Sequence, residues 1–264
     1  MGSDIAEEMR RDYVCDLIRS GKRMDGRRFL EYREISVEKG VVKRAEGSAR
    51  VKIGNTQVLV GVKMEIGEPF PDIPNEGVII TNAEFVPLAS PEFEPGPPDE
   101  NSVELARVVD RGIRGSHALD VESLCIEEGE KVWMIFIDIH VLDDDGNLVD
   151  ASALGAIAAL MNTRIPYERH GFSPREVNPK VDNLMVKYTP VAVTTVEIDG
   201  NILVDPNMFE ESAADARLIV TSTEDGDISC IQKSGSGVLS ENTFERMIDI
   251  AVEEAHRIRK IYLR

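Results

Sequence analysis

The chain has 264 residues, with 30 lysines and arginines against 48 aspartates and glutamates, and hence a formal charge of −18 at neutral pH. A protein with that average field repels free nucleic acid and anionic membranes, so any contact with phosphate must come from a local cluster of basic side chains. With 42% hydrophobic residues, the composition is that of a globular protein and excludes a wholly disordered one.

The cysteines and the N-terminus indicate the compartment. Cys15, Cys125 and Cys230 are odd in number, far apart and without C-x-x-C spacing. This pattern argues against a disulfide framework and against a zinc site. No stretch of the sequence approaches the roughly 20 apolar residues needed to cross a bilayer, and the first residues are acidic rather than basic. We therefore expect a cytoplasmic protein.

The first predicted elements are a helix and three strands. Apolar residues recur every four positions over 3–20, which predicts an amphipathic helix. Residues 48–53 alternate between apolar and basic, and Gly54-Asn55 separates them from the β-branched segment 56–64, so the sequence predicts a hairpin. A third apolar run, 78–86, predicts a strand that ends in a proline-rich surface loop.

The middle of the chain predicts a helix, a strand and a second helix. After the loop, Asp99 or Asn101 can cap a helix with apolar residues at helical spacing. Lys131–Leu142 is rich in Ile and Val and predicts a buried strand. The acidic turn 143–147 then leads into an alanine-rich helix over 151–162.

The second half of the chain predicts two hairpins and a long helix. Residues 191–198 and 202–204 flank one turn, and 218–222 and 228–232 flank another. Residues 240–263 carry apolar side chains at helical spacing and basic residues near the C-terminal end. Because strands come in hairpins and helices follow groups of strands, we expect an α+β fold with mixed sheets.

We expect a single domain over residues 1–264. Within it we distinguish the N-terminal helix, 1–21, a first part of the core, 22–185, and a second part that ends in the C-terminal helix, 186–264. The four histidines share no metal-ligand spacing, and the sequence contains neither a dinucleotide-binding fingerprint nor a hydrolase triad motif. We therefore expect neither a bound metal nor a cofactor.

Three arginines form the candidate phosphate-binding cluster. Arg107, Arg111 and Arg114 are spaced by four and three residues, which places them along one stripe of the predicted helix. Guanidinium groups in such a row suit a phosphate backbone. The alternative is that they only form intramolecular ion pairs with Glu104 and Asp110.

Several motifs occur together in one order along the chain. The residues are Asp25-Gly26-Arg27, Gly47-Ser48, Gly54-Asn55-Thr56-Gln57-Val58-Leu59, a proline-rich segment over 86–101, and Glu104-Leu105-Ala106-Arg107-Val108-Val109-Asp110-Arg111-Gly112-Ile113-Arg114. In this order and spacing the chain resembles the RNase PH family, and in particular the non-catalytic ring subunit of the archaeal exosome. The resemblance covers nearly the whole chain and implies an RNase PH-like fold.

The resemblance also implies partners and a reaction. Members of this class alternate with a catalytic RNase PH-like homologue in a ring of three heterodimers, which also carries RNA-binding cap subunits. Single-stranded RNA threads the central channel and is degraded from its 3′ end by phosphorolysis. That reaction brings two anions together, so an active site needs cations, hydrogen-bond donors and carboxylates for a divalent metal.

The positions that match the catalytic pattern have lost those groups. Leu148 and Val149 stand where active members place the Thr and Arg that hold phosphate, and Asp150 adds a carboxylate beside them. Of the two metal-binding aspartates, the first matches Glu211 and the second is replaced by Arg217. We therefore expect no catalytic residues in this chain.

Two other functions stay open from the sequence. The first is a phosphorolytic 3′–5′ exoribonuclease that is active by itself and uses Glu211 and Asp215 in a rearranged site, although Asp215 lies at the wrong position on an alternating strand. The second is a structural spacer that makes no contact with RNA. The first hypothesis remains a non-catalytic subunit that contributes to RNA binding and to structuring the partner's active site.

Overall fold

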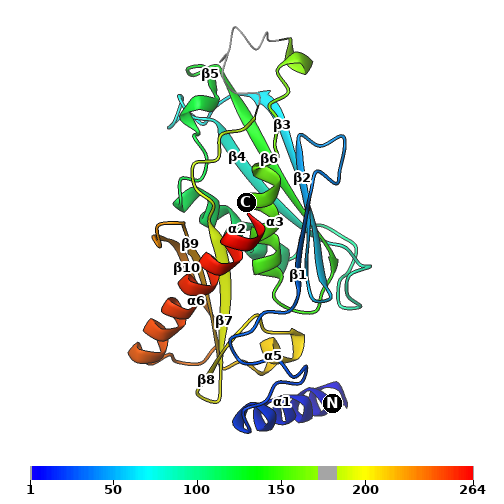
Figure 1. The fold of residues 1–264 in the computed structure, drawn as a ribbon. Helices are drawn as coiled ribbons and strands as arrows, with labels where there is room; N and C mark the ends of the chain where they lie inside the picture. The colour runs from blue at the N-terminus through cyan, green and yellow to red at the C-terminus, as the bar shows by residue number, and fades with distance from the viewer. Residues whose placement is uncertain (1, 172–182, 264) are drawn as a thin grey trace.

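The structure is a computed structural model that describes residues 2–171 and 183–263. Two β-sheets are joined and flanked by helices, with one helix between the sheets (Figure 1). The expected α+β fold with mixed sheets is confirmed. Within the described residues, none of the helices is long and apolar enough to span a membrane.

The first sheet contains six strands in the order β1-β2-β3-β6-β4, with β5 paired to β6. Its strands are β1 Ile35–Lys39, β2 Gly47–Ile53, β3 Thr56–Gly67, β4 Val78–Phe85, β5 Cys125–Glu127 and β6 Lys131–Asp143. The predicted hairpin is the β2–β3 pair, in which Ile53 faces Thr56 across the turn. Gly54 has a positive φ of 59°, which glycine adopts without strain.

The second sheet is antiparallel throughout, in the order β10-β9-β7-β8. Its strands are β7 Val191–Ile198, β8 Asn201–Val204, β9 Ala216–Ser222 and β10 Ile228–Ser234. Both hairpins predicted for the second half of the chain are confirmed.

The helices are α1 Gly2–Arg19, α2 Glu100–Gly115, α3 Leu148–Leu160, α5 Met208–Ala213 and α6 Glu241–Tyr262, with single 3₁₀ turns at Glu122–Leu124 and Glu168–His170. Of the two candidate caps for α2, the chain uses Asp99, whose carboxylate accepts the Ser102 N–H at 2.8 Å. Helix α2 packs against β4 and β10, and α6 covers β7 and β9 (Figure 1).

Helix α3 lies between the two sheets, where it packs against β2 and β3 on one side and β7 on the other (Figure 1). Its alanines and glycine permit this close approach, since a Cβ on Gly155 would lie 2.8 Å from Val60 Cγ2. The helix begins at Leu148 rather than at the predicted Ala151. Leu148, Val149 and Asp150 therefore belong to its first turn.

Three short elements were not predicted: β1, β5 and α5. Strand β1 has five residues and β5 has three, so neither is long enough for a clear alternating pattern. Helix α5 has only six residues and begins with a capping box between Asn207 and Glu210. The parallel pairing of β4 with β6 also cannot be read from local pattern, because it joins segments far apart in the chain.

A buried ion pair ties the N-terminal segment to the second half of the chain. The side chains of Arg23 and Glu210 are both 0% exposed, with Nε–Oε1 and Nη2–Oε2 distances of 2.8 and 2.5 Å. The guanidinium also donates to the carbonyls of Val204 and Asp205. The bidentate geometry and the extra acceptors compensate the cost of removing both charges from water.

A second buried carboxylate, that of Asp205, extends the same network. It accepts from Arg27 Nη1 at 2.8 Å, from Arg33 Nη2 at 2.8 Å and from Asn147 Nδ2 at 2.7 Å. Burial opposes ionisation of Asp205, but the hydrogen bonds and charge of Arg33 hold its pKa below the ordinary value. The segment 23–33 is thereby fixed against the first turn of α3.

We expect either Arg23→Met or Glu210→Met to lower the free energy of unfolding by about 3–5 kcal/mol, because each leaves one charge buried without its partner. The double variant should lose less than the sum of the two single losses. Urea unfolding measures both quantities. Arg50→Ala, which breaks the exposed pair with Glu38, is the control and should cost less than about 1 kcal/mol. Equal losses at the buried and exposed pairs would contradict this assignment.

Candidate functional site

The β6–α3 turn, residues 143–147, is held in place by close backbone packing. Gly146 has a φ of 81°, and a Cβ there would lie 2.5 Å from the backbone nitrogen of Met208. Asn147 follows with a left-handed φ of 61° and precedes the first turn of α3. The turn therefore presents the N-terminus of α3 directly to the segment that contains α5.

The carboxylate of Asp150 points into the core rather than toward this site. It accepts hydrogen bonds from Tyr32 Oη at 2.7 Å, Asn147 Nδ2 at 2.9 Å, Thr194 Oγ1 at 2.7 Å and Thr194 N at 3.1 Å. Burial raises its pKa to about 6 despite these donors. The expectation that Asp150 adds a carboxylate to the phosphate site was wrong, because its side chain lies on the inner face of α3.

Glu211, on α5, lies against the N-terminus of α3. Its Oε1 accepts the Asn147 N–H at 3.0 Å and lies 3.7 Å from Nη1 of Arg217. Arg217 is itself held by a 2.8 Å hydrogen bond from Nε to Ser234 Oγ. The helix N-terminus, a position that favours anions, is thus occupied by a carboxylate of the chain itself.

Desolvation raises the pKa of Glu211 to about 7, although Arg217 and the Asn147 N–H both favour its ionised form. Its side chain is 26% exposed. Burial also raises the pKa of Asp144, which lies in the adjacent turn. The site therefore already holds two carboxyl groups of the chain itself, Asp144 and Glu211, beside the N-terminus of α3.

Asp215, the second carboxylate considered from the sequence, is not part of this group. It precedes β9 instead of lying on the strand, and its two oxygens accept from Arg11 Nη2 at 3.3 Å and from the Asp199 N–H at 2.9 Å. Its partners therefore belong to α1 and to the β7–β8 turn. Within the described residues, no group of three or more His, Cys, Asp or Glu side chains is arranged to hold a metal ion.

Leu148, Val149, Glu211 and Arg217, the four positions that match the catalytic pattern but have lost its groups, are here called the degenerate positions. All four line one hollow of about 910 Å³. Arg10 and Arg11 of α1 line it as well, and Arg10 lies 6.0 Å from the ring centroid of Phe209. The sequence analysis missed these α1 arginines. Nothing in the sequence signals that the N-terminal helix folds back beside α5.

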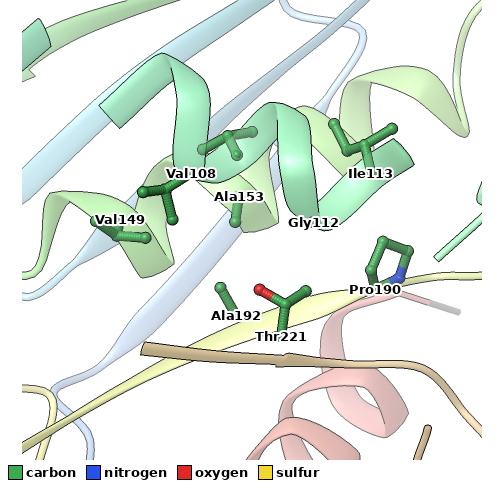
Figure 2. A pocket seen from close by; sticks show the side chains of 9 residues that line it. Val108, Gly112, Ile113, Val149, Ala153, Pro190, Ala192 and Thr221 are labelled. Carbon is green, nitrogen blue, oxygen red and sulfur yellow. The ribbon is translucent and has the colours of Figure 1, made fainter. Parts of the chain in front are cut away.

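A smaller cavity of about 10 Å³ lies between α2, α3 and the second sheet. Figure 2 shows Val149 beside Val108, with Ala192 and Thr221 opposite them. This volume holds at most one water molecule and the lining is largely apolar, so the cavity is no ligand site. It does show that Val149 packs into the apolar contact between the two helices, which is the wrong environment for an anion.

The three arginines of α2 are exposed and differ in their contacts. Arg114 pairs with Asp110 through Nε at 2.7 Å and donates to the Ile79 carbonyl. Arg111 donates to Gln232 Oε1 at 2.8 Å, and Arg107 has no side-chain partner among the described residues. Intramolecular pairing thus accounts for Arg114 and leaves Arg107 available.

The chain matches two family models. Residues 31–166 match domain 1 of the 3′ exoribonuclease family called RNase PH, and residues 188–254 match domain 2. Among curated proteins, exosome complex component Rrp42 of Archaeoglobus fulgidus is 53% identical, and Rrp42 of Methanocella arvoryzae is 54% identical. Each of these alignments covers 98% of this chain and 98% of the relative.

Two solved structures are similar over the same length. The Archaeoglobus fulgidus exosome with RNA bound to its active site contains a chain with a TM-score of 0.91 and 53% identity, covering 97% of this chain and 98% of that one. A chain of an archaeal exosome core gives a TM-score of 0.89 at 48% identity, with full coverage of both chains.

The raised pKa of Glu211 predicts a specific pH dependence. The folded state binds this proton more tightly than the unfolded chain, so stability falls as pH rises from the ordinary value of 4.5 to about 7. The loss through this group is at most about 3 kcal/mol. Glu211→Gln keeps an acceptor for the Asn147 N–H and should remove that component, which makes the variant relatively more stable near pH 7. Urea unfolding of the wild type and of the variant at both pH values tests this. The prediction is refuted if the free energy of unfolding changes with pH by the same amount in both proteins.

Proposed function

Because the chain belongs to the RNase PH family of 3′ exoribonucleases, we propose that it is a non-catalytic subunit of an archaeal exosome. In this proposal the chain alternates with a catalytic RNase PH-like homologue in a ring of three heterodimers, which also carries RNA-binding cap subunits. Its compartment in this proposal is the cytoplasm, supported by three cysteines that are all unpaired.

The observation that carries the non-catalytic assignment is the carboxylate of Glu211 at the N-terminus of α3. Inorganic phosphate would have to displace this side chain from the Asn147 N–H at 3.0 Å. The next two residues, Leu148 and Val149, offer hydrocarbon where phosphate needs donors. Arg217 brings a positive charge where a divalent metal needs a carboxylate.

The rival enzyme, active by itself through Glu211 and Asp215, lacks support. The two carboxylates have separate partners: Glu211 accepts from Asn147 and lies near Arg217, whereas Asp215 accepts from Arg11 and Asp199. A metal shared by both would have to break these contacts. This arrangement argues against a catalytic metal site built from these two residues.

The proposed RNA contact is the stripe Arg107, Arg111 and Arg114. Support comes from its exposure on α2 and from the incomplete intramolecular pairing of its members, most clearly of Arg107. Phosphate contacts of this kind position a strand without reading its sequence. The spacer alternative requires that none of the three touches RNA.

We expect the purified chain to show no phosphate-dependent degradation of RNA and no polymerisation from nucleoside diphosphates. Both activities should appear when the catalytic homologue is added and a ring forms, which native mass measurement can follow. Product release should be measured with and without inorganic phosphate and a divalent metal. Phosphate-dependent turnover by the isolated chain would overturn the non-catalytic assignment.

We expect replacement of all three α2 arginines by Ala to weaken RNA binding by the assembled ring. The log-log salt slope should shrink by about 0.7 per lost contact on a single strand, and so by about 2 in total. Arg107→Ala alone should reduce the slope without a change in stability, because Arg107 has no side-chain partner among the described residues. An unchanged slope in the triple variant would favour the spacer.

A further inference from the structure

The connection between β1 and β2 contains an exposed basic turn. The Ala45 N–H donates to the Val42 carbonyl at 3.3 Å, which closes a four-residue turn. Lys43 and Arg44 are its two central residues, and both side chains are exposed. The turn therefore presents two adjacent cations at its tip.

A third cation, Arg164, lies four residues after the end of α3 at Leu160. The Glu46 N–H donates to the Val62 carbonyl, and the Arg164 N–H donates to the Glu46 carbonyl, both at 3.0 Å. These bonds fix the turn between β3 and residue 164, and Arg164 is itself exposed. Lys43, Arg44 and Arg164 are here called the basic turn surface.

The nearby carboxylates are already occupied by other cations. Glu46, whose side chain is only 10% exposed, lies 2.6 Å from Lys63 Nζ and 3.3 Å from Arg169 Nη1. Glu65 pairs with Arg169 Nη2 at 2.7 Å. None of the three side chains of the basic turn surface has a partner among the described residues. In a chain of charge −18, this is a local surplus of positive charge without internal compensation.

The surface is separate from the arginine stripe. Strand β1 forms one edge of the first sheet and β4 the other, and α2 packs against β4 (Figure 1). The turn adjoins the β1 edge, since it leads into β2, the neighbour of β1. A ligand at the turn therefore does not use the contacts of α2.

We propose that the basic turn surface is a second binding site for the phosphate backbone of single-stranded RNA. Two of its three members are arginines, whose planar guanidinium groups bind phosphate oxygens in pairs. An acidic protein is the competing ligand, but the core of a protein interface is apolar and aromatic. In the described connection, Val42, at 37% exposure, is the single exposed large hydrophobic residue.

This inference rests on the proposed function, and the test uses the assembled ring. Lys43→Ala, Arg44→Ala and Arg164→Ala are combined in one variant of this chain. The matched control is Arg246→Ala, Arg257→Ala and Lys260→Ala, which also removes two arginines and one lysine, all exposed on α6. The probe is a fluorescein-labelled oligoadenylate of about 30 nucleotides, and its anisotropy gives affinity over a range of NaCl concentrations.

The turn variant should bind the probe more weakly, with a log-log salt slope smaller by about 2, and the α6 control should keep the wild-type slope. Equal slopes in the wild type and the turn variant overturn the inference. Equal losses of RNA affinity in the turn variant and the control also overturn it, because they would show an effect of net charge and not of a local site. Loss of ring or cap assembly with an unchanged RNA slope also overturns it, in favour of an acidic protein partner.

Native mass measurement separates this inference from the proposed function. If the wild-type chain forms no ring with its catalytic homologue, the proposed function fails, and the same titration on the isolated full-length chain then decides the inference. If the ring forms and the turn variant binds RNA as well as the wild type, only the inference is overturned and the proposed function stands.

Discussion

Buried arginine–carboxylate contacts hold the N-terminal segment, the second sheet and the first turn of α3 in one arrangement. Arg23, Arg27 and Arg33 neutralise Glu210 and Asp205, and Asn147 joins Asp205 to Asp150. Each charge is expensive to bury and is tolerated because an opposite charge and further hydrogen bonds compensate it. The partners lie on different parts of the chain, so the same contacts hold those parts together. This network also sets the geometry at the N-terminus of α3, because Asn147 is part of the network and is the residue that precedes the helix.

The cost of burying an unpaired charge divides the arginines into two groups. Some are paired inside the fold, and others stay exposed and free to bind an external anion. The arginines near residue 25 belong to a basic motif, yet their donors are directed to internal carboxylates and carbonyls. The exposed arginines of α2 and the basic turn surface have few or no such partners. A place in a basic motif therefore does not by itself leave an arginine of this chain free to bind an external anion.

The sequence could predict the elements with a clear period, such as the β2–β3 hairpin and α6, because their patterns are local. It could not predict the parallel β4–β6 pairing or the inward direction of Asp150, because both depend on contacts between distant segments. Leu148, Val149, Glu211 and Arg217 were predicted as degenerate positions from the resemblance. That Glu211 accepts the N–H of Asn147, just before α3, and that α1 contributes Arg10 and Arg11 to the hollow required the structure.

Helix α3 is shared by the hydrophobic interiors of both sheets, and a Cβ at Gly155 would already clash with Val60. A hinge between the two halves of the chain would have to slide this helix across one of the sheets. The two sheets are therefore held at a separation that is set by the diameter of one small-residue helix. In the proposed ring, the angles between successive subunits must add up to one full turn, so a chain whose two sheets keep a fixed spacing would restrict the number of subunits that can complete the circle.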